Sequence, residues 1–224
     1  MIPWEQLGSA NVPDGEGELR LMKRGHEFSI MAGAIELMSS RLSGSEESLA
    51  TLTCARLADR PRAHMLIGGL GMGFTLRAAL KTLGPDARVT VAELVPEVLA
   101  WARGPMAALH GDSLTDPRVT LVQGDVAALI NDRREAYDAI LLDVDNGPEG
   151  LMRKSNDDLY DAYGLREAQR ALRLGGVLAV WSSAPNPGFT QRLKAVGFAV
   201  EDLRVWAKGR PGGARHVIWL ATRL

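Results

Sequence analysis

The stretch Leu66-Ile67-Gly68-Gly69-Leu70-Gly71-Met72-Gly73 decides the fold, because it joins a strand pattern to a helix pattern through a glycine-rich turn. Residues 63–67 form an apolar run typical of a buried strand, and the helical pattern of residues 74–83 closes at Gly84-Pro85. Glycines let the backbone turn tightly and approach a ligand closely. The helix start at about Gly73 offers unpaired N–H groups and a positive dipole end. The turn therefore predicts a ligand site at the end of a βα unit.

The spacing around this turn identifies the type of ligand. Glu93 ends the next predicted strand, 20 residues past Gly73, where its carboxylate can accept hydrogen bonds from both hydroxyls of a ribose. The NAD fingerprint G-x-G-x-x-G would need a glycine at position 74, which is Phe74. The spacing G-x-G-x-G favours a nucleoside of the S-adenosylmethionine type instead. We assign to this ligand the residues Gly68, Gly69, Gly71, Gly73, Glu93 and Leu94; glycines that serve only tight packing remain the alternative.

Two further strand ends carry acidic residues. Asp125, in Gln123-Gly124-Asp125-Val126, can accept a hydrogen bond from an adenine amino group, or it can cap the following helix; the two roles are compatible. We assign both Asp125 and Val126 to the nucleoside site.

The fourth strand of the predicted large sheet runs into Asp143-Val144-Asp145-Asn146-Gly147-Pro148, at the sheet edge where doubly wound folds bind ligands. Asp143 and Asp145 are the candidate catalytic residues, as partners of a cationic amine or as general bases, and Asp143 is also assigned to the nucleoside site. A polar loop is the alternative. No metal site is predicted, because no histidine or cysteine clusters near them in the sequence.

The rest of the chain predicts an α/β protein. Residues 1–15 are predicted to be irregular because they are rich in glycine, proline and asparagine or aspartate. Short strands are predicted over residues 18–23, 27–31 and 34–38, and a helix over residues 46–57 with Ser45 as N-cap. From residue 61, strands and helices alternate; the strands are 63–67, 88–92, 119–122, 137–142, 177–181, 198–206 and 216–221, and the helices are 74–83, 95–109, 126–133, 157–174 and 189–196.

Because helices connect all but the last two strands, those two must pair antiparallel at one edge of a mostly parallel seven-stranded sheet. This is the arrangement of the Rossmann-like class I methyltransferase fold. We expect an N-terminal β-hairpin extension with a leading helix in residues 1–60, and an adenosyl-binding transferase domain in residues 61–224.

Composition narrows the function. The 224 residues are 46% hydrophobic and carry a formal net charge of -1, so the overall charge favours neither nucleic acid nor an anionic membrane as a partner. The sequence has one cysteine, Cys54, which cannot form an internal disulfide, and its N-terminus shows no signal segment. These features predict a cytoplasmic protein.

Together these segments resemble the spermidine synthase family, the aminopropyltransferases built on the methyltransferase fold. The likeness extends over about residues 18–206 and includes 66–69, 91–98, 116–119, 123–125, 137–143 and 174–178. The resemblance implies that Glu93 and Asp125 bind the nucleoside and that Asp143 deprotonates an attacking amine. It also implies a small β-extension at the N-terminus.

The chain departs from the family pattern at residues that hold amines. The family turn reads G-G-G-D-G, and its aspartate helps hold the amine end of decarboxylated S-adenosylmethionine. In this chain Leu70 stands in place of the third glycine and Gly71 in place of the aspartate. The family loop D-S-T-D-P-x-G-P is shortened to residues 143–148, and Ser45-Glu46-Glu47 lies about where a Tyr-His-Glu motif is expected.

From these departures we predict a methyltransferase that uses S-adenosylmethionine and a small-molecule acceptor, an amine being one option. The alternatives are an aminopropyltransferase that makes polyamines from decarboxylated S-adenosylmethionine, a non-catalytic adenosyl-binding module, and, disfavoured by the glycine spacing, an NAD-linked oxidoreductase. A homodimer is left open.

Overall fold

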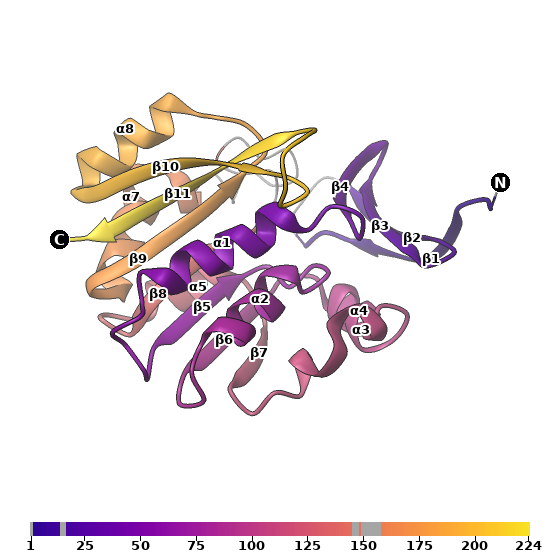
Figure 1. Cartoon of the computed structure of the whole chain (residues 1–224), viewed down its shortest axis with the longest axis horizontal. Coiled ribbons are helices and arrows are strands. Elements are labelled where there is room, and N and C mark those ends of the chain that lie inside the picture. Colours follow the sequence, from indigo (N-terminus) through magenta and orange to yellow (C-terminus); the bar gives the residue numbers. More distant parts are fainter. Residues whose placement is uncertain (1, 14–16, 145–147, 149–157) are drawn as a thin grey trace.

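The computed structural model describes residues 2–13, 17–144, 148 and 158–224. A seven-stranded sheet forms its centre, in the strand order β10-β11-β9-β8-β5-β6-β7 (Figure 1). The strands are β5 (His64–Gly68), β6 (Arg88–Glu93), β7 (Val119–Gln123), β8 (Tyr137–Leu142), β9 (Leu172–Ser182), β10 (Phe198–Trp206) and β11 (Arg215–Arg223). The pairs from β9 to β7 are parallel, whereas β11 pairs antiparallel with both β9 and β10. This confirms the predicted fold class.

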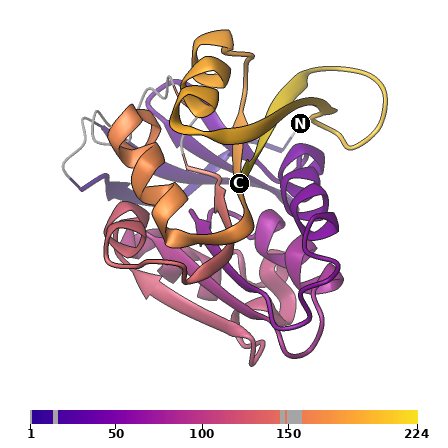
Figure 2. The same ribbon diagram turned by 90° about the vertical axis from the view of Figure 1, so that its left-hand side faces the viewer.

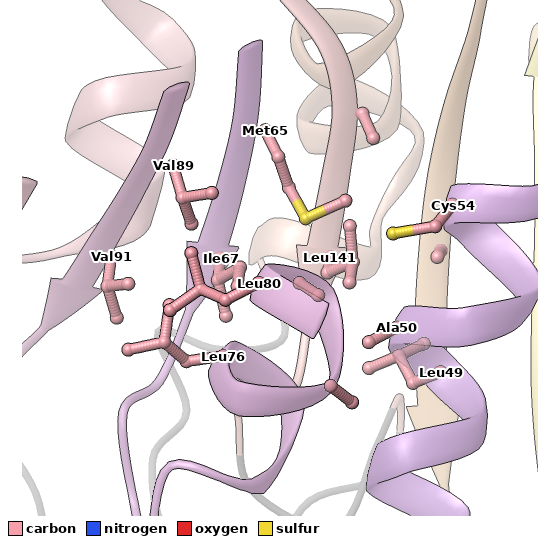
Figure 3. Close-up of a cluster of buried hydrophobic side chains, with 14 of the residues drawn as sticks. Leu49, Ala50, Cys54, Met65, Ile67, Leu76, Leu80, Val89, Val91 and Leu141 are labelled. Atoms are coloured by element: carbon pink, nitrogen blue, oxygen red, sulfur yellow. The ribbon is translucent and has the colours of Figure 1, made fainter. Parts of the chain in front are cut away.

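Helices cover both faces of this sheet, as the two views in Figures 1 and 2 show. Along the strands, alternate side chains enter different cores; Met65 and Ile67 of β5 belong to one, and Leu66 to the other. In Figure 3, Met65 and Ile67 lie among side chains of the helices on the first face. That face packs against α1 (Gly44–Ala55), α2 (Phe74–Thr82) and α3 (Pro96–Arg103), and the second against α5 (Val126–Asn131), α7 (Ala162–Ala171) and α8 (Pro187–Val196).

A separate four-stranded antiparallel sheet precedes these elements and corresponds to the predicted β-extension. It consists of β1 (Glu5–Asn11), β2 (Glu18–Arg24), β3 (Glu27–Ala32) and β4 (Ile35–Ser39). Its buried side chains, such as Leu21 and Ile30, share a third core with Met72 and Phe74 and with Trp101 of α3. The small sheet is therefore packed directly against the glycine-rich turn and its helix.

Strand β1 corrects the prediction that residues 1–15 are irregular. Residues 5–11 pair with β2, with a register shift between Gln6 and Gly8. Gly8 is needed there, because a Cβ at this position would lie 2.8 Å from Nε1 of Trp101. The glycine that suggested irregular structure is thus part of a bulged edge strand that packs against α3.

Two predicted helices are shorter than expected. The predicted helix 95–109 is interrupted by Gly104 and Pro105 and forms α3 and the short α4 (Ala107–His110), which is followed by a 3₁₀ turn (Gly111–Leu114). The predicted helix 157–174 begins outside the described residues, and α7 ends at Ala171, where β9 starts. Gly175 and Gly176 therefore lie in an irregular part of the β8–β9 pairing, with φ +68° at Gly175, and do not stop a helix.

The start of α1 also differs from the prediction. Its N-cap is Ser43 and not Ser45. The Ser43 hydroxyl donates to the Glu47 carboxylate over 2.9 Å, while Ser45 lies inside the helix and donates to its neighbour Glu46. Across residues 2–13, 17–144 and 158–224, no helix is both long and apolar enough to cross a bilayer.

Candidate functional site

A cavity of about 190 Å³ lies between the ends of the parallel strands and the small sheet. Its floor comes from the glycine-rich turn and from residues that follow β6, β7 and β8, and the small sheet closes it with Leu19, Ile30, Leu37 and Met38. The other lining residues are Glu46, Gly69, Gly71, Ala92, Glu93, Leu94, Val98, Gly124, Asp125, Val126, Asp143, Val144 and Trp181. Seven of the predicted site residues are thus brought together: Gly69, Gly71, Glu93, Leu94, Asp125, Val126 and Asp143.

The turn itself needs glycine where it lines the cavity. Gly69 has φ +87°, and a Cβ there would lie 2.5 Å from the carbonyl oxygen of Asp143. This close approach joins the turn to the end of β8, as does the bond from the Asp143 N–H to the Gly68 carbonyl at 3.1 Å. Gly68 and Gly73 lie at the two ends of the turn and are absent from the described cavity lining; Gly73 caps α2 with φ +74°.

Glu93 is fixed against the cavity by the backbone. Its Oε2 accepts from the Leu70 N–H and its Oε1 from the Val95 N–H, both at 2.9 Å. Burial raises the pKa of this carboxyl, and the hydrogen bonds from these N–H groups oppose the rise. The carboxylate therefore links the glycine turn to the loop after β6 while remaining part of the cavity wall.

Asp125 has the capping role, one of the two roles that the sequence left open. It is the N-cap of α5, because its Oδ1 accepts from the Ala127 N–H at 2.8 Å, and it lines the cavity. Capping fixes the direction of the side chain at the end of β7. Its contact with an adenine amino group stays a prediction.

Asp143 faces a second buried carboxylate that the sequence reasoning did not assign, that of Glu46 on α1. The Thr75 hydroxyl of α2 lies beside both residues: its oxygen is 2.6 Å from Asp143 Oδ2 and 3.3 Å from the backbone carbonyl oxygen of Glu46. Burial raises the pKa of Asp143 to about 6. Burial, and then the charge of Asp143, raise the pKa of Glu46 to about 7. Two acidic groups with such raised pKa values in one cavity are typical of a functional site.

Glu46 is held in place by a chain of polar contacts that reaches the C-terminal hairpin. Ser45 Oγ lies 2.5 Å from Glu46 Oε2, and His216 Nδ1 lies 2.9 Å from Ser45 Oγ. When the Ser45 hydroxyl donates to an ionised Glu46, its oxygen can accept a hydrogen bond from the Nδ1–H tautomer of His216. The His216 ring packs edge-on against Trp181, with ring centroids 4.8 Å apart, and Trp181 lines the cavity.

The helical phase of α1 is the sequence signal that points to Glu46. Leu49, Ala50 and Thr53 are buried and lie three, four and seven positions after it, on the same helix face. Glu47, the next residue, does not lie on this buried helix face and is exposed. Asp145, the second predicted catalytic residue, lies outside the described residues.

Residues 46–190 match the family model described as the spermine/spermidine synthase domain. The chain belongs to the spermine/spermidine synthase family.

Relatives in this family are named polyamine aminopropyltransferases. The protein of Corynebacterium efficiens is 33% identical over 131 residues, which is 57% of this chain and 24% of that protein. Polyamine aminopropyltransferase 1 of Streptomyces coelicolor is 32% identical over 128 residues, 56% of this chain and 23% of that protein. The matched segment thus spans about a quarter of the length of these two relatives.

Solved structures of spermidine synthases share the fold. The enzyme of Thermotoga maritima superposes with a TM-score of 0.77 at 16% identity, over 98% of this chain and 73% of that one. A spermidine synthase in complex with the transition-state analogue AdoDATO superposes with a TM-score of 0.76, over 98% of this chain and 72% of that one. These superpositions confirm the predicted class I methyltransferase-like fold.

The preference for methyl transfer was wrong. The family model and the curated relatives are those of polyamine aminopropyltransferases, which was the alternative function. The error came from the departures in the turn, in the loop after Asp143 and at the expected Tyr-His-Glu motif, from which we expected a cavity poor in groups that bind amines. The structure brings Glu46 into the cavity from another element, so a further acidic side chain is present although the turn does not supply one.

Proposed function

We propose that this chain is an aminopropyltransferase that binds decarboxylated S-adenosylmethionine in the cavity beside the glycine turn and acts on a small primary amine. The observation that carries the proposal is the charge of the cavity. Its described lining residues include the four acids Glu46, Glu93, Asp125 and Asp143, and none of them is lysine or arginine. Such a lining favours ligands that bring positive charges and no carboxylate.

The magnitude of this preference decides between the two forms of the nucleoside. A carboxylate held about 4 Å from another carboxylate is repelled by about 4 kcal/mol at an effective dielectric constant near 20. S-adenosylmethionine carries such a group at the end of its tail, and its decarboxylated form carries only the sulfonium and an ammonium. Because the described lining offers no cation to neutralise a ligand carboxylate, the decarboxylated form is the better fit.

The residues present suit the nucleoside. Glu93 ends β6 in the cavity wall, where an acidic side chain can accept hydrogen bonds from the hydroxyls of a ribose. Asp125 lies at the neighbouring strand end for the adenine, with Leu94 and Val126 as apolar walls. Because Gly69 and Gly71 have no side chain, a nucleoside can approach the backbone of the turn closely.

When bound, decarboxylated S-adenosylmethionine would supply an aminopropyl group attached to a sulfonium leaving group. Asp143 would accept the proton of the acceptor amine, a role suited to a carboxyl with a pKa of about 6. Thr75 would keep the carboxylate in its orientation through the 2.6 Å hydrogen bond. The small sheet would exclude water from the apolar side of the cavity.

The test is release of methylthioadenosine from decarboxylated S-adenosylmethionine in the presence of diamines and monoamines. We expect release with at least one primary amine and tighter calorimetric binding of the decarboxylated form than of S-adenosylmethionine. Asp143→Asn should bind methylthioadenosine as the wild type does and lose at least about 100-fold in turnover, whereas Glu47→Gln, a substitution at an exposed site, should behave as the wild type.

Two results would refute this proposal in different ways. Tighter binding of S-adenosylmethionine, with no methylthioadenosine released for any amine, would contradict aminopropyl transfer. Unchanged turnover of Asp143→Asn would remove Asp143 from the reaction while leaving the nucleoside site intact.

A further inference from the structure

The glycine turn cannot itself supply a carboxylate to the cavity. Position 71 is glycine with φ +48°, and the Met38 side chain of β4 fills the space beside it. A Cβ on Gly71 would lie 2.7 Å from Cε and 2.8 Å from Sδ of Met38. The same Sδ accepts a hydrogen bond from the Met72 N–H at 3.1 Å, so the thioether of Met38 is in direct contact with the turn.

Glu46 enters the same cavity from a different element. It is 8% exposed, it starts the buried face of α1, and its carbonyl oxygen lies next to the Thr75 hydroxyl at the start of α2. Its backbone therefore lies beside the first turn of α2, and the residue lines the same cavity as the glycine turn. Ser45 and, through it, His216 hold the carboxylate in one orientation.

The charged groups around Glu46 leave it without a cation among the described lining residues. Asp143 faces it from the end of β8, Glu47 is its neighbour on α1, and His216 contacts Ser45 from β11. The pKa of His216 is lowered by burial, so this ring is neutral near pH 7. A buried carboxylate among such neighbours is stabilised by a bound cation.

Two carboxylates that line one cavity, on different elements, match two cationic amines. Asp143 is fixed at a strand end by Thr75, whereas Glu46 has a longer side chain on α1. The proposed reaction brings one primary ammonium on the nucleoside and one amine on the acceptor. With Asp143 assigned to the acceptor amine, Glu46 is the group that remains for the ammonium of the nucleoside.

Resting on the proposed aminopropyl transfer, we propose that Glu46 is the specificity-determining residue that binds the terminal ammonium of decarboxylated S-adenosylmethionine, in place of a carboxylate on the glycine turn. Trp181 completes this subsite with an aromatic wall, and aromatic rings attract ammonium groups. Ser45 and His216 are positioning residues that keep the Glu46 carboxylate directed into the cavity.

The experiment measures binding of three nucleosides by calorimetry, without turnover. Decarboxylated S-adenosylmethionine carries a sulfonium and an ammonium, the dimethylsulfonium analogue of adenosine carries only the sulfonium, and methylthioadenosine carries neither. Glu46→Gln should weaken binding of the first ligand about 10- to 100-fold and leave the other two unchanged. Glu47→Gln applies the same chemical change one residue away at an exposed position and should alter none of the three.

The outcomes separate this inference from the proposed function. If Glu46→Gln weakens all three nucleosides equally, or none, Glu46 does not bind the ammonium and the inference is overturned, although the nucleoside site stands. If the wild type binds none of the three nucleosides, the proposed function is refuted, and the inference about Glu46, which rests on it, is refuted as well. Unchanged binding of methylthioadenosine reports that the variant is folded, and Glu46→Asp, which keeps the charge, should recover part of the lost affinity.

Discussion

Replacing Glu46 by glutamine should make the ligand-free protein more stable at pH 8, although the same change removes a proposed binding group. Glu46 is buried, and burial followed by the charge of Asp143 raises its pKa from 4.5 to about 7. Each unit of pKa corresponds to about 1.4 kcal/mol, so an ionised Glu46 costs the folded state about 3 kcal/mol. Glutamine has nearly the same shape and cannot ionise.

The sign of the pH dependence follows from proton binding. Between pH 4.5 and about 7 the folded protein holds the Glu46 proton more firmly than the unfolded chain does. The free energy of unfolding therefore falls as the pH rises through this window, and the full cost is present above it. In Glu46→Gln this contribution is missing, while the similar contribution of Asp143 remains, because burial raises its pKa to about 6.

The assay is thermal or urea unfolding of both proteins without ligand, followed by circular dichroism from pH 4.5 to pH 8. At pH 8 the variant should be more stable by about 3 kcal/mol, equivalent to roughly 6–12 °C in Tm for a chain of this size. At pH 4.5 the two should coincide. Glu47→Gln, at an exposed position, should follow the wild type within about 0.5 kcal/mol throughout. Equal stability of Glu46→Gln and the wild type at pH 8 would refute a buried, ionised Glu46 facing Asp143.

Three further predictions concern the turn, the sugar contact and the opposite end of the sheet. Gly69→Ala forces φ +87° on alanine, which costs about 1–2 kcal/mol, and places a methyl group against the Asp143 carbonyl. This variant should bind methylthioadenosine at least about tenfold more weakly. The control Gly84→Ala, whose Cβ would be 3.8 Å from its nearest contact, should bind it as the wild type does. Glu93→Gln should abolish the preference for a ribonucleoside over its 2′,3′-dideoxy analogue, and an unchanged preference would show that Glu93 does not bind the sugar. Asp138→Asn breaks the ion pairs with Arg60 and Arg173 and should lower the free energy of unfolding by about 3–5 kcal/mol at pH 7. Urea titrations should show a smaller difference between this variant and the wild type at pH 3.5.

The last of these rests on a direction of pKa shift opposite to that of Glu46. Burial raises the pKa of Asp138, but the His64 N–H and the Arg60 guanidinium donate to it, and the charges of Arg173 and Arg60 add to their effect, so the net pKa is lowered. A carboxyl with a lowered pKa stabilises the folded state above its ordinary pKa, and this stabilisation is lost as the pH falls. A difference that does not shrink in acid would contradict the ion-pair explanation.

The sequence predicted those parts of the fold whose limits are marked by local residue signals. The β5–turn–α2 unit and the strand β8 were found because glycines, prolines and apolar runs mark their limits. Strand β1 was missed because its residues are mostly exposed and its pairing depends on β2, which no local pattern reveals. The end of α7 was misplaced because the glycine pair that resembled a helix stop belongs to the β8–β9 pairing.

The candidate site was predicted to the extent that it lies at strand ends. Glu93, Asp125 and Asp143 follow parallel strands, and the carboxyl ends of such strands meet at one edge of the sheet. Glu46 was missed as a site residue because it comes from a helix that precedes the sheet, so only the tertiary packing brings it to that edge. The wrong preference for methyl transfer came from the missing amine-holding residues of the family motifs, and without Glu46 the sequence reasoning had no other group to set against it.

The position of Glu46 depends on the C-terminal hairpin, which explains why a residue near the start of the chain and the last strands form one site. The Gly44 N–H donates to the Ala207 carbonyl at 2.9 Å, and a Cβ on Gly44 would lie 1.9 Å from the Gly209 backbone nitrogen. The first turn of α1 is therefore pressed against the β10–β11 connection, and His216 of β11 holds Ser45. A carboxylate on the glycine turn is fixed by the turn alone, whereas one on α1 is fixed only if the hairpin is in place. In the proposed site, the group assigned to the ammonium therefore depends on the antiparallel edge of the sheet, and the groups assigned to the nucleoside depend on its parallel strands.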